Sequence, residues 1–207
     1  MQQVITVIDD YLPKPQLMKQ ESKTLQFRQD LINASNLTSD RSKYASGIHR
    51  RLNSLINYKV NWGKESGTFR TTTQSRILKT NYEYYVHEDG ATNVVALLYL
   101  SQSPQCHGWT CFYRHKETGL DGFHDLKGVA DFLIKTGRTL EHLIQIITRD
   151  ALIPSKWEQT DRVQTKYNRM LIYNGRKFHS HLFNFKNINP TFKRLTFSCY
   201  GTTSGRF

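Results

Sequence analysis

The stretch Arg76-Ile-Leu-Lys-Thr-Asn-Tyr-Glu-Tyr-Tyr-Val-His-Glu-Asp89 is the part of the sequence that says most about the fold. Its aromatic and β-branched residues predict a strand. On an extended backbone the side chains of residues i and i+2 point to the same face, so His87 and Asp89 would project side by side. An imidazole nitrogen and a carboxylate oxygen in this arrangement could bind one metal ion.

The sequence around this stretch predicts a chain made mainly of strands. The apolar run Val94-Val-Ala-Leu-Leu-Tyr-Leu100 is typical of a buried strand. Apolar residues spaced three and four apart predict a long helix over about 128–152. Further strands are expected over 4–8, 109–114, 168–173, 177–185 and 194–200, helices over 15–34 and 48–56, and a loop over 35–50. Strands on both sides of a helical segment predict an α+β fold with a mainly β core.

The length of 207 residues suits a single domain, 1–207, with a helical insertion at about 115–157. No apolar run approaches the roughly 20 residues of a membrane helix. The N-terminus lacks the basic start and apolar stretch of a secretory signal, and three cysteines without regular spacing do not predict a disulfide framework. We therefore expect a cytoplasmic protein that does not enter a membrane.

The chain is strongly basic, with a formal net charge of +12. From Asp161 onward there are nine basic residues and one acid, which gives this segment a charge of +8. A localised positive field favours anionic partners such as nucleic acid or an anionic small ligand. A solvated face that keeps the protein in solution explains the same charge equally well.

Six segments, taken in order, resemble the Fe(II)/2-oxoglutarate-dependent dioxygenases, and among these the prolyl-4-hydroxylase-like branch. They span about residues 4–200. The segments are the opening Val-Ile-Asp-Asp-Tyr-Leu-Pro13, His87-Glu-Asp89, Leu98-Tyr-Leu100, His107-Gly-Trp-Thr-Cys-Phe112, Tyr173-Asn-Gly-Arg-Lys-Phe-His179 and Arg194-Leu-Thr196. Position 107 departs from the family's pattern, because His stands where the first Gly of Gly-Gly-x-Thr-x-Phe is usual.

The resemblance implies a double-stranded β-helix, or jelly roll, with N-terminal helices that support it. It also implies Fe(II) held by His87, Asp89 and a distal histidine, which is the two-histidine, one-carboxylate set of non-haem iron oxygenases. His179 and His181 lie two residues apart on one predicted strand, so their side chains share a face. Strand alternation therefore does not decide which of them is the distal ligand. The Phe-His-Ser sequence after a Tyr-Asn-Gly turn favours His179, with His181 as the alternative.

The resemblance further implies 2-oxoglutarate as cosubstrate with O2. Arg194 would bind the far carboxylate through paired donors, Thr196 would add a hydroxyl from the same strand face, and Thr110 would be a further cofactor contact. The expected activity is hydroxylation of a small molecule or peptide whose identity the motifs do not constrain, and they do not constrain the oligomeric state either.

Three alternatives stay open at this point. The first is a basic protein directed at nucleic acid, either as an oxygenase or as a binding module. The second is a jelly roll that has lost its chemistry. The third is a structural zinc site, but its candidate ligands lack the usual Cys-x₂₋₄-Cys spacing. Those ligands are Cys106, His107, Cys111 and His115.

Overall fold

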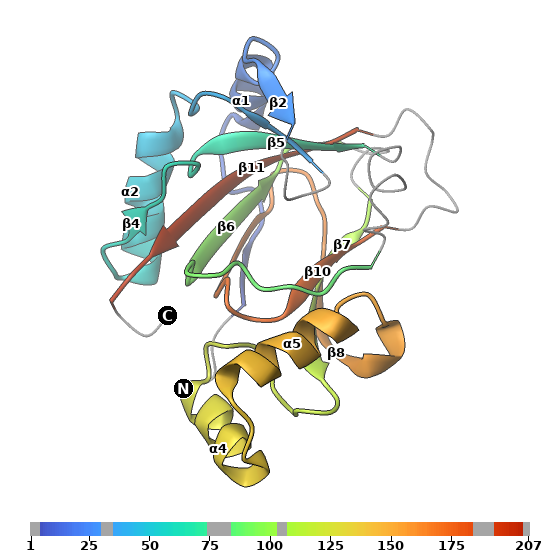
Figure 1. The fold of residues 1–207 in the computed structure, drawn as a ribbon. Helices are drawn as coiled ribbons and strands as arrows, with labels where there is room; N and C mark the ends of the chain where they lie inside the picture. The colour runs from blue at the N-terminus through green and yellow to red at the C-terminus, as the bar shows by residue number, and fades with distance from the viewer. Residues whose placement is uncertain (1–4, 30–34, 74–83, 103–106, 184–192, 205–207) are drawn as a thin grey trace.

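The structure is a computed structural model that describes residues 5–29, 35–73, 84–102, 107–183 and 193–204 (Figure 1). The helices are α1 (Pro15–Glu21), α2 (Ala45–Ile56), α4 (Leu126–Thr136), α5 (Leu140–Asp150) and the short 3-10 helix η1 (Pro154–Lys156). The strands are β1 (Thr6–Ile8), β2 (Phe27–Gln29), β3 (Asn36–Thr38), β4 (Asn61–Trp62), β5 (Thr68–Thr73), β6 (Val94–Tyr99), β7 (Trp109–His115), β8 (Trp157–Gln164), β9 (Met170–Tyr173), β10 (His179–Leu182) and β11 (Lys193–Thr202).

These strands form two antiparallel sheets within the described part of the chain. The larger sheet has the order β1-β9-β6-β11-β5-β3-β2, with β4 paired to β11. The smaller sheet has the order β10-β7-β8. Phe112 of β7 and Leu97 of β6 belong to one buried cluster between the two sheets, so the sheets face each other. Two facing antiparallel sheets are the arrangement of a jelly roll.

The central strand β6 explains why its sequence is apolar throughout. Ala96 and Leu98 pack into the cluster beneath α1 and α2, while Val95 and Leu97 point the other way, toward the smaller sheet. A strand that is covered on both faces has no solvent-facing side, so it cannot show the polar–apolar alternation of a half-exposed strand.

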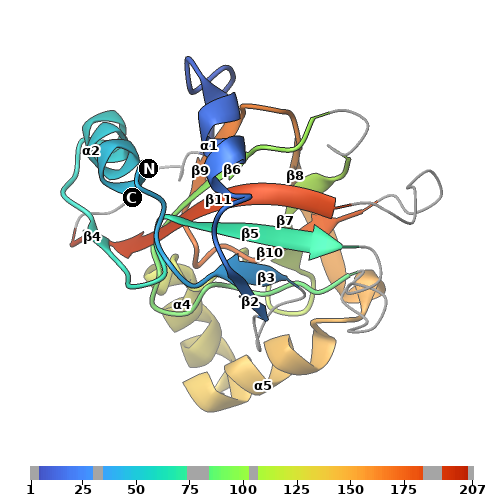
Figure 2. The same cartoon turned by 90° about the horizontal axis from the view of Figure 1, so that it is seen from above.

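The helices cover the outer faces of this sandwich. Helices α1 and α2 lie against the larger sheet, whereas α4 and α5 lie at the opposite end of the molecule, against the smaller sheet (Figures 1 and 2). A third cluster, which includes Leu143 and Ile147 of α5 together with Trp157 and Phe178, fixes the insertion to that sheet. The predicted α+β jelly roll with N-terminal helices and a helical insertion is confirmed.

The long helix predicted over 128–152 is wrong, because the structure has two helices there. Gly137 ends α4 in the left-handed conformation, with φ of 64°. Thr139 then caps the next helix, since its side chain accepts a hydrogen bond from the His142 amide. A left-handed glycine followed by a threonine cap ends one helix and starts another.

The N-terminal prediction is also wrong in its extent, because α1 ends at Glu21 and β2 follows within the predicted helix. Ser22 and Thr24 donate their side-chain hydroxyls to the carbonyls of Lys19 and Glu21. Such local hydrogen bonds compete with a continuing helix. The predicted loop over 35–50 instead contains β3 and the start of α2.

Two further strand boundaries differ from expectation. Residues 76–83 of the opening stretch lie outside the described residues. Within 84–89 only His87 is bridged, to His179, so this part is not a regular strand. Strand β8 forms where no strand was predicted. None of the described helices combines the length and apolar character that a membrane span requires.

Candidate metal centre

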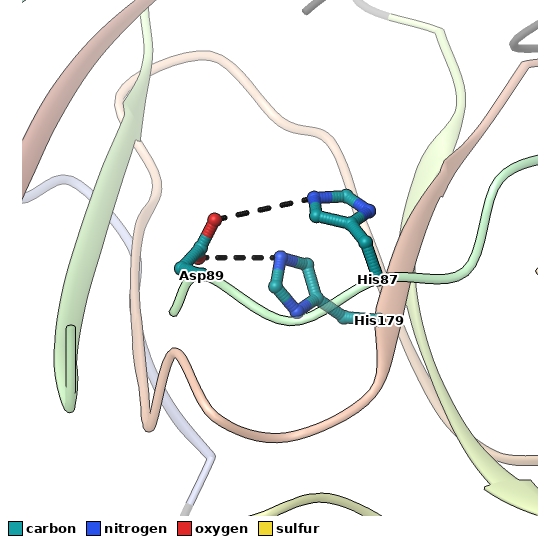
Figure 3. A group of neighbouring side chains, drawn as sticks. All are labelled: His87, Asp89 and His179. Atoms are coloured by element: carbon teal, nitrogen blue, oxygen red, sulfur yellow. Dashed lines mark ion pairs between the residues drawn. The ribbon is translucent and has the colours of Figure 1, made fainter. Parts of the chain in front are cut away.

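Three side chains from two distant parts of the sequence converge between the two sheets (Figure 3). They are His87 and Asp89, in the segment that leads into β6, and His179, the first residue of β10. His179 Nε2 lies 3.4 Å from Asp89 Oδ2, and His87 Nε2 lies 4.0 Å from Asp89 Oδ1. One ligand atom from each residue lies within 4.8 Å of the other two. The structure thus brings together the three residues expected from the sequence.

The backbone fixes this convergence. The amides of His87 and His179 each donate to the other's carbonyl, at 3.0 and 2.9 Å. The Asp89 amide donates to the Gly175 carbonyl at 2.8 Å. A Cβ atom on Gly175 would lie 2.6 Å from the Thr92 carbonyl oxygen and 3.2 Å from the Asp89 Cβ. Only glycine therefore allows the turn before β10 to approach Asp89 so closely.

Both histidines have their ring protons assigned by the backbone. His179 Nδ1 lies 2.8 Å from the Lys177 carbonyl oxygen, and His87 Nδ1 lies 3.1 Å from the Tyr85 carbonyl oxygen. A carbonyl can only accept, so both Nδ1 atoms donate, and each neutral ring carries its lone pair on Nε2. The Tyr85 ring stacks on His87 with centroids 5.1 Å apart and holds its plane.

Burial keeps His179 in the neutral form that a metal requires. The residue is 2% exposed, and burial lowers its pKa to about 4 despite the opposing effect of Asp89. The imidazole is therefore uncharged at neutral pH, with Nε2 directed at the carboxylate (Figure 3).

The donor set fits a divalent cation. Asp89 Oδ2 is buried and accepts no hydrogen bond from any described group. A buried carboxylate oxygen beside two imidazole lone pairs is costly without a positive charge. Around a small octahedral divalent ion, with metal–ligand distances of about 2.1 Å, neighbouring ligand atoms lie about 3 Å apart. The ligand atoms of the two histidines lie 3.4 and 4.0 Å from the Asp89 oxygens, slightly farther than this. Two histidines and one carboxylate are the set used for non-haem Fe(II).

The three groups line a pocket of about 350 Å³ that extends between the sheets. Arg194 and Thr196 also line it, from the same face of β11. Arg194 is 3% exposed, and its guanidinium lies 4.4 Å from the ring centroid of Phe183, a stacking contact that holds the cation in place. The structure thus puts the predicted metal ligands and the predicted carboxylate-binding residues in one pocket.

His181 lines the pocket, whereas Thr110, the further cofactor contact expected from the sequence, lies behind it and is not among the lining residues. His181 lines the pocket but is not a member of the metal-binding group found among the described residues. Its Nδ1 lies 3.3 Å from the Thr110 hydroxyl, which lies 2.8 Å from the Tyr99 hydroxyl. Thr110 is fully buried behind His181. Burial and the nearby Arg194 cation hold the pKa of His181 well below its usual value.

The residues of the zinc alternative do not form a metal-binding group in the described part of the chain. Burial raises the pKa of Cys111, which disfavours the thiolate that zinc needs. His115 Nε2 instead lies 3.1 Å from the carboxylate of Asp150. Cys106 lies outside the described residues.

Sequence reasoning missed Arg70, which lines the same pocket from β5. The available signal was the Arg-x-Thr spacing of Arg70 and Thr72, which puts both side chains on one face of a strand. Arg194 and Thr196 on β11 have the same spacing. It also missed Gly175 and Lys177, whose backbone carbonyls contact Asp89 and His179. Every residue has a backbone carbonyl, so the residue type does not indicate which carbonyls make such contacts.

Comparison with solved structures identifies proteins of the same fold. HygX from Streptomyces hygroscopicus, solved with nickel, 2-oxoglutarate and hygromycin B bound, is 13% identical with a TM-score of 0.58, over 98% of this chain and 84% of HygX. SnoK, a non-haem α-ketoglutarate-dependent carbocyclase from nogalamycin biosynthesis, is 12% identical with a TM-score of 0.56, over 98% and 80%. A prolyl-4-hydroxylase from Pseudomonas putida is 12% identical with a TM-score of 0.52, over 99% and 95%.

These similarities confirm the fold that the resemblance implied. The chain has the fold of the Fe(II)/2-oxoglutarate-dependent oxygenases, including the prolyl-4-hydroxylase. Among curated proteins, no sequence match was found. One family model, described as "Family of unknown function (DUF6445)", matches residues 1–200.

Proposed function

The chain belongs to the DUF6445 family, and we propose that it is an Fe(II)- and 2-oxoglutarate-dependent dioxygenase that hydroxylates a small molecule. One observation supports the proposal above all others. His87, Asp89 and His179 bring ligand atoms within 4.8 Å of one another on the wall of a pocket that Arg194 also lines. A metal-chelating dicarboxylate needs a metal at one end and a cation at the other.

In this proposal each residue has a definite task. His87, Asp89 and His179 would hold Fe(II) at the wall of the pocket. Arg194 binds the far carboxylate of 2-oxoglutarate through paired donors, and Thr196 adds a hydroxyl donor beside it. With O2, the iron and 2-oxoglutarate supply an oxidation in which 2-oxoglutarate becomes succinate and CO2 while one oxygen atom enters the substrate.

The pocket walls orient these groups and limit access of water. Tyr173 packs its ring against His179, with centroids 4.9 Å apart, and Leu97 and Phe183 give the pocket apolar surfaces. His181 faces the pocket as a neutral imidazole next to Arg194. We assign it a supporting role beside the cosubstrate, and His179 the role of distal ligand.

A nucleic-acid partner is less favoured, since four of the nine cations of the basic C-terminal segment have acidic partners or lie in the pocket. Lys166 and Arg169 both bind Asp9. Lys177 pairs with Asp121 in a largely buried position, and Arg194 lies inside the pocket. These four cations are therefore engaged within the protein.

Anaerobic reconstitution tests the proposal. Protein mixed with Fe(II) and 2-oxoglutarate should develop the visible absorption band of the chelate, and exposure to O2 should yield succinate. Asp89→Ala should lose both signals while keeping the wild-type circular dichroism spectrum. Wild-type protein without band or succinate, or an Asp89→Ala variant that behaves as wild type, would show that the fold has no such activity here. That result would favour the jelly roll that has lost its chemistry.

A further inference from the structure

The helical insertion carries most of the large apolar side chains that are exposed in the described part of the chain. Ten such side chains are exposed there, and six of them lie between residues 126 and 153. The two most exposed, Ile134 at 81% and Leu126 at 68%, both belong to α4. Single exposed apolar residues are common on monomers, but a group of them on one element marks an interaction site.

Helix α4 has two apolar faces. On one face, Val129 is buried in the cluster that fixes the insertion to the smaller sheet. On the other, Leu126, Ala130 and Ile134 are all exposed. Residues four apart lie one above the other on a helix, so these three form a single stripe. The helix lies at the lower end of the molecule in Figure 1, where this stripe is accessible to a partner.

The exposed stripe is symmetric about Ala130. Leu126 lies one helical turn before Ala130 and Ile134 lies one turn after it. Two copies of α4 that pack antiparallel about a two-fold axis at Ala130 therefore bring Leu126 of each copy beside Ile134 of the other. The small Ala130 side chain at the centre allows the two helices to approach closely.

The charges beside the stripe complement one another in the same arrangement. Lys127 and Asp131 lie on one flank of the stripe, with side chains that are 87% and 63% exposed. In the antiparallel pair the two flanks run side by side in opposite directions, so Lys127 of each copy comes next to Asp131 of the other. Such reciprocal pairs of opposite charge favour one register of the contact over others.

The charge of the whole chain also favours this face for contact between two copies. Residues 126–153 contain four basic and three acidic residues, so this segment carries +1 of the net charge of +12 and the rest carries +11. Like charges repel, so two copies approach at the lowest electrostatic cost where each is nearly neutral. An anionic membrane fits this face less well, because helices that lie on such membranes have Lys and Arg along the polar face, whereas Asp131 lies beside this stripe.

We propose that α4 is a homodimerisation surface, on which two copies of this chain pack antiparallel about a two-fold axis at Ala130. The helix has 11 residues and is about 16 Å long, so the contact is smaller than the roughly 800 Å² per partner of a standard interface. The dimer is therefore weak, with a Kd of about 1 µM or higher. The described residues that line the pocket include none from α4, so this inference does not depend on the proposed function.

Sedimentation velocity of the full chain at about 1 to 500 µM measures this association. We expect wild-type protein to change from monomer to dimer over this range. Ile134→Glu should weaken the dimer about tenfold or more, because it puts a charge into the apolar stripe. Leu55→Glu is the matched control, since Leu55 is a 48% exposed residue of α2 and should leave the association unchanged. Circular dichroism should show that both variants fold.

Charge variants test the register of the contact. Asp131→Lys should weaken the dimer severalfold, because Lys127 of the other copy then meets a positive charge. The double variant Lys127→Asp with Asp131→Lys should recover wild-type affinity, since it exchanges the two charges and restores the net charge of +12. Glu158→Lys is the matched control, because it changes the net charge as Asp131→Lys does, at an exposed position of β8. It should weaken the dimer less.

Cross-linking tests the centre of the contact. A short bismaleimide should link Ala130→Cys to its own copy in much higher yield than Leu55→Cys or wild-type protein. Wild-type protein that stays monomeric at about 500 µM, or a dimer of unchanged strength in Ile134→Glu, would overturn the proposal. A dimer in which Ala130→Cys links no better than Leu55→Cys would show that the copies meet elsewhere. Monomeric protein that binds vesicles of anionic phospholipid, with binding lost in Ile134→Glu, would assign the stripe to a membrane instead.

Discussion

Replacing Asp121 by Asn should weaken metal binding, although Asp121 touches none of the proposed ligands. Asp121 Oδ2 accepts a 2.7 Å hydrogen bond from Lys177 Nζ, and the Lys177 carbonyl accepts the Nδ1 proton of His179. The amide of Phe178 also donates to the Asp121 carbonyl at 2.9 Å. The ion pair therefore fixes the short segment whose carbonyl orients the distal histidine.

The size of the effect follows from this geometry. Lys177 is 8% exposed. Burial raises the pKa of Asp121, but the hydrogen bond and charge of Lys177, together with the nearby His124 and Arg114, outweigh this effect, so the pKa is lowered. Removing one partner of a fully buried pair costs about 3–5 kcal/mol. The Asp121 side chain is 31% exposed, so solvent screening reduces this to about 1–3 kcal/mol. Loss of a group that orients a metal-bound histidine lowers metal affinity roughly 10- to 100-fold.

Two measurements on the same variant separate stability from positioning. Urea unfolding gives the stability change, and anaerobic titration with Co(II) or Fe(II) gives the metal Kd. Asp131→Asn is the matched control, because it breaks an exposed pair with Lys127 on α4 and should alter neither quantity. If Asp121→Asn unfolds more readily but its metal Kd stays within twofold of wild type, the pair stabilises the protein without orienting His179.

Three further predictions follow from the same pocket and its surroundings. His179→Ala should abolish the Fe(II)–oxoglutarate absorption band, while His181→Ala should keep the band with at most a tenfold weaker 2-oxoglutarate Kd; the opposite pattern would make His181 the ligand. Arg194→Lys should raise the 2-oxoglutarate KM at least tenfold, because one ammonium cannot replace paired donors, and an unchanged KM would contradict the role given to Arg194. Burial and the nearby Arg41 lower the pKa of His49 to about 4, below its usual 6.5. As the pH falls, the unfolded protein therefore binds a proton at His49 before the folded protein does. The free energy of unfolding should decrease by up to about 3 kcal/mol as the pH drops from 6.5 to 4. Urea unfolding of His49→Gln should show a decline smaller by a similar amount, and an equal decline would mean that His49 titrates normally in the folded protein.

The sequence predicts the parts of the fold that depend on burial and residue type. The run 94–100 is apolar because β6 is covered on both sides, and that pattern can be recognised without coordinates. The division between α4 and α5 depends on Gly137 adopting φ of 64°. A glycine within an apolar periodic pattern can stay helical at modest cost, so the break was not evident from periodicity alone.

Some of the residues of the pocket could be predicted from the sequence, and others could not. The pairing of β11 with β5 puts Arg70 across from Thr196, but strand pairing over such a distance in the chain cannot be read from one sequence. The candidate ligands His87 and Asp89 could be recognised because they lie only two positions apart in the chain. Their relation to His179 depends on one bridge between distant segments.

The two histidines also share a device that residue types do not reveal. Each Nδ1 donates to the carbonyl of the residue two positions earlier, Tyr85 for His87 and Lys177 for His179. Because any residue offers that carbonyl, the protein can fix both tautomers without a dedicated second side chain. The two tautomers therefore depend on the backbone conformation of each segment. The reciprocal bridge between the two histidines and the close approach of Gly175 maintain that conformation. Substitutions that displace this backbone should therefore alter metal binding more than changes to the Tyr85 or Lys177 residue type that preserve it.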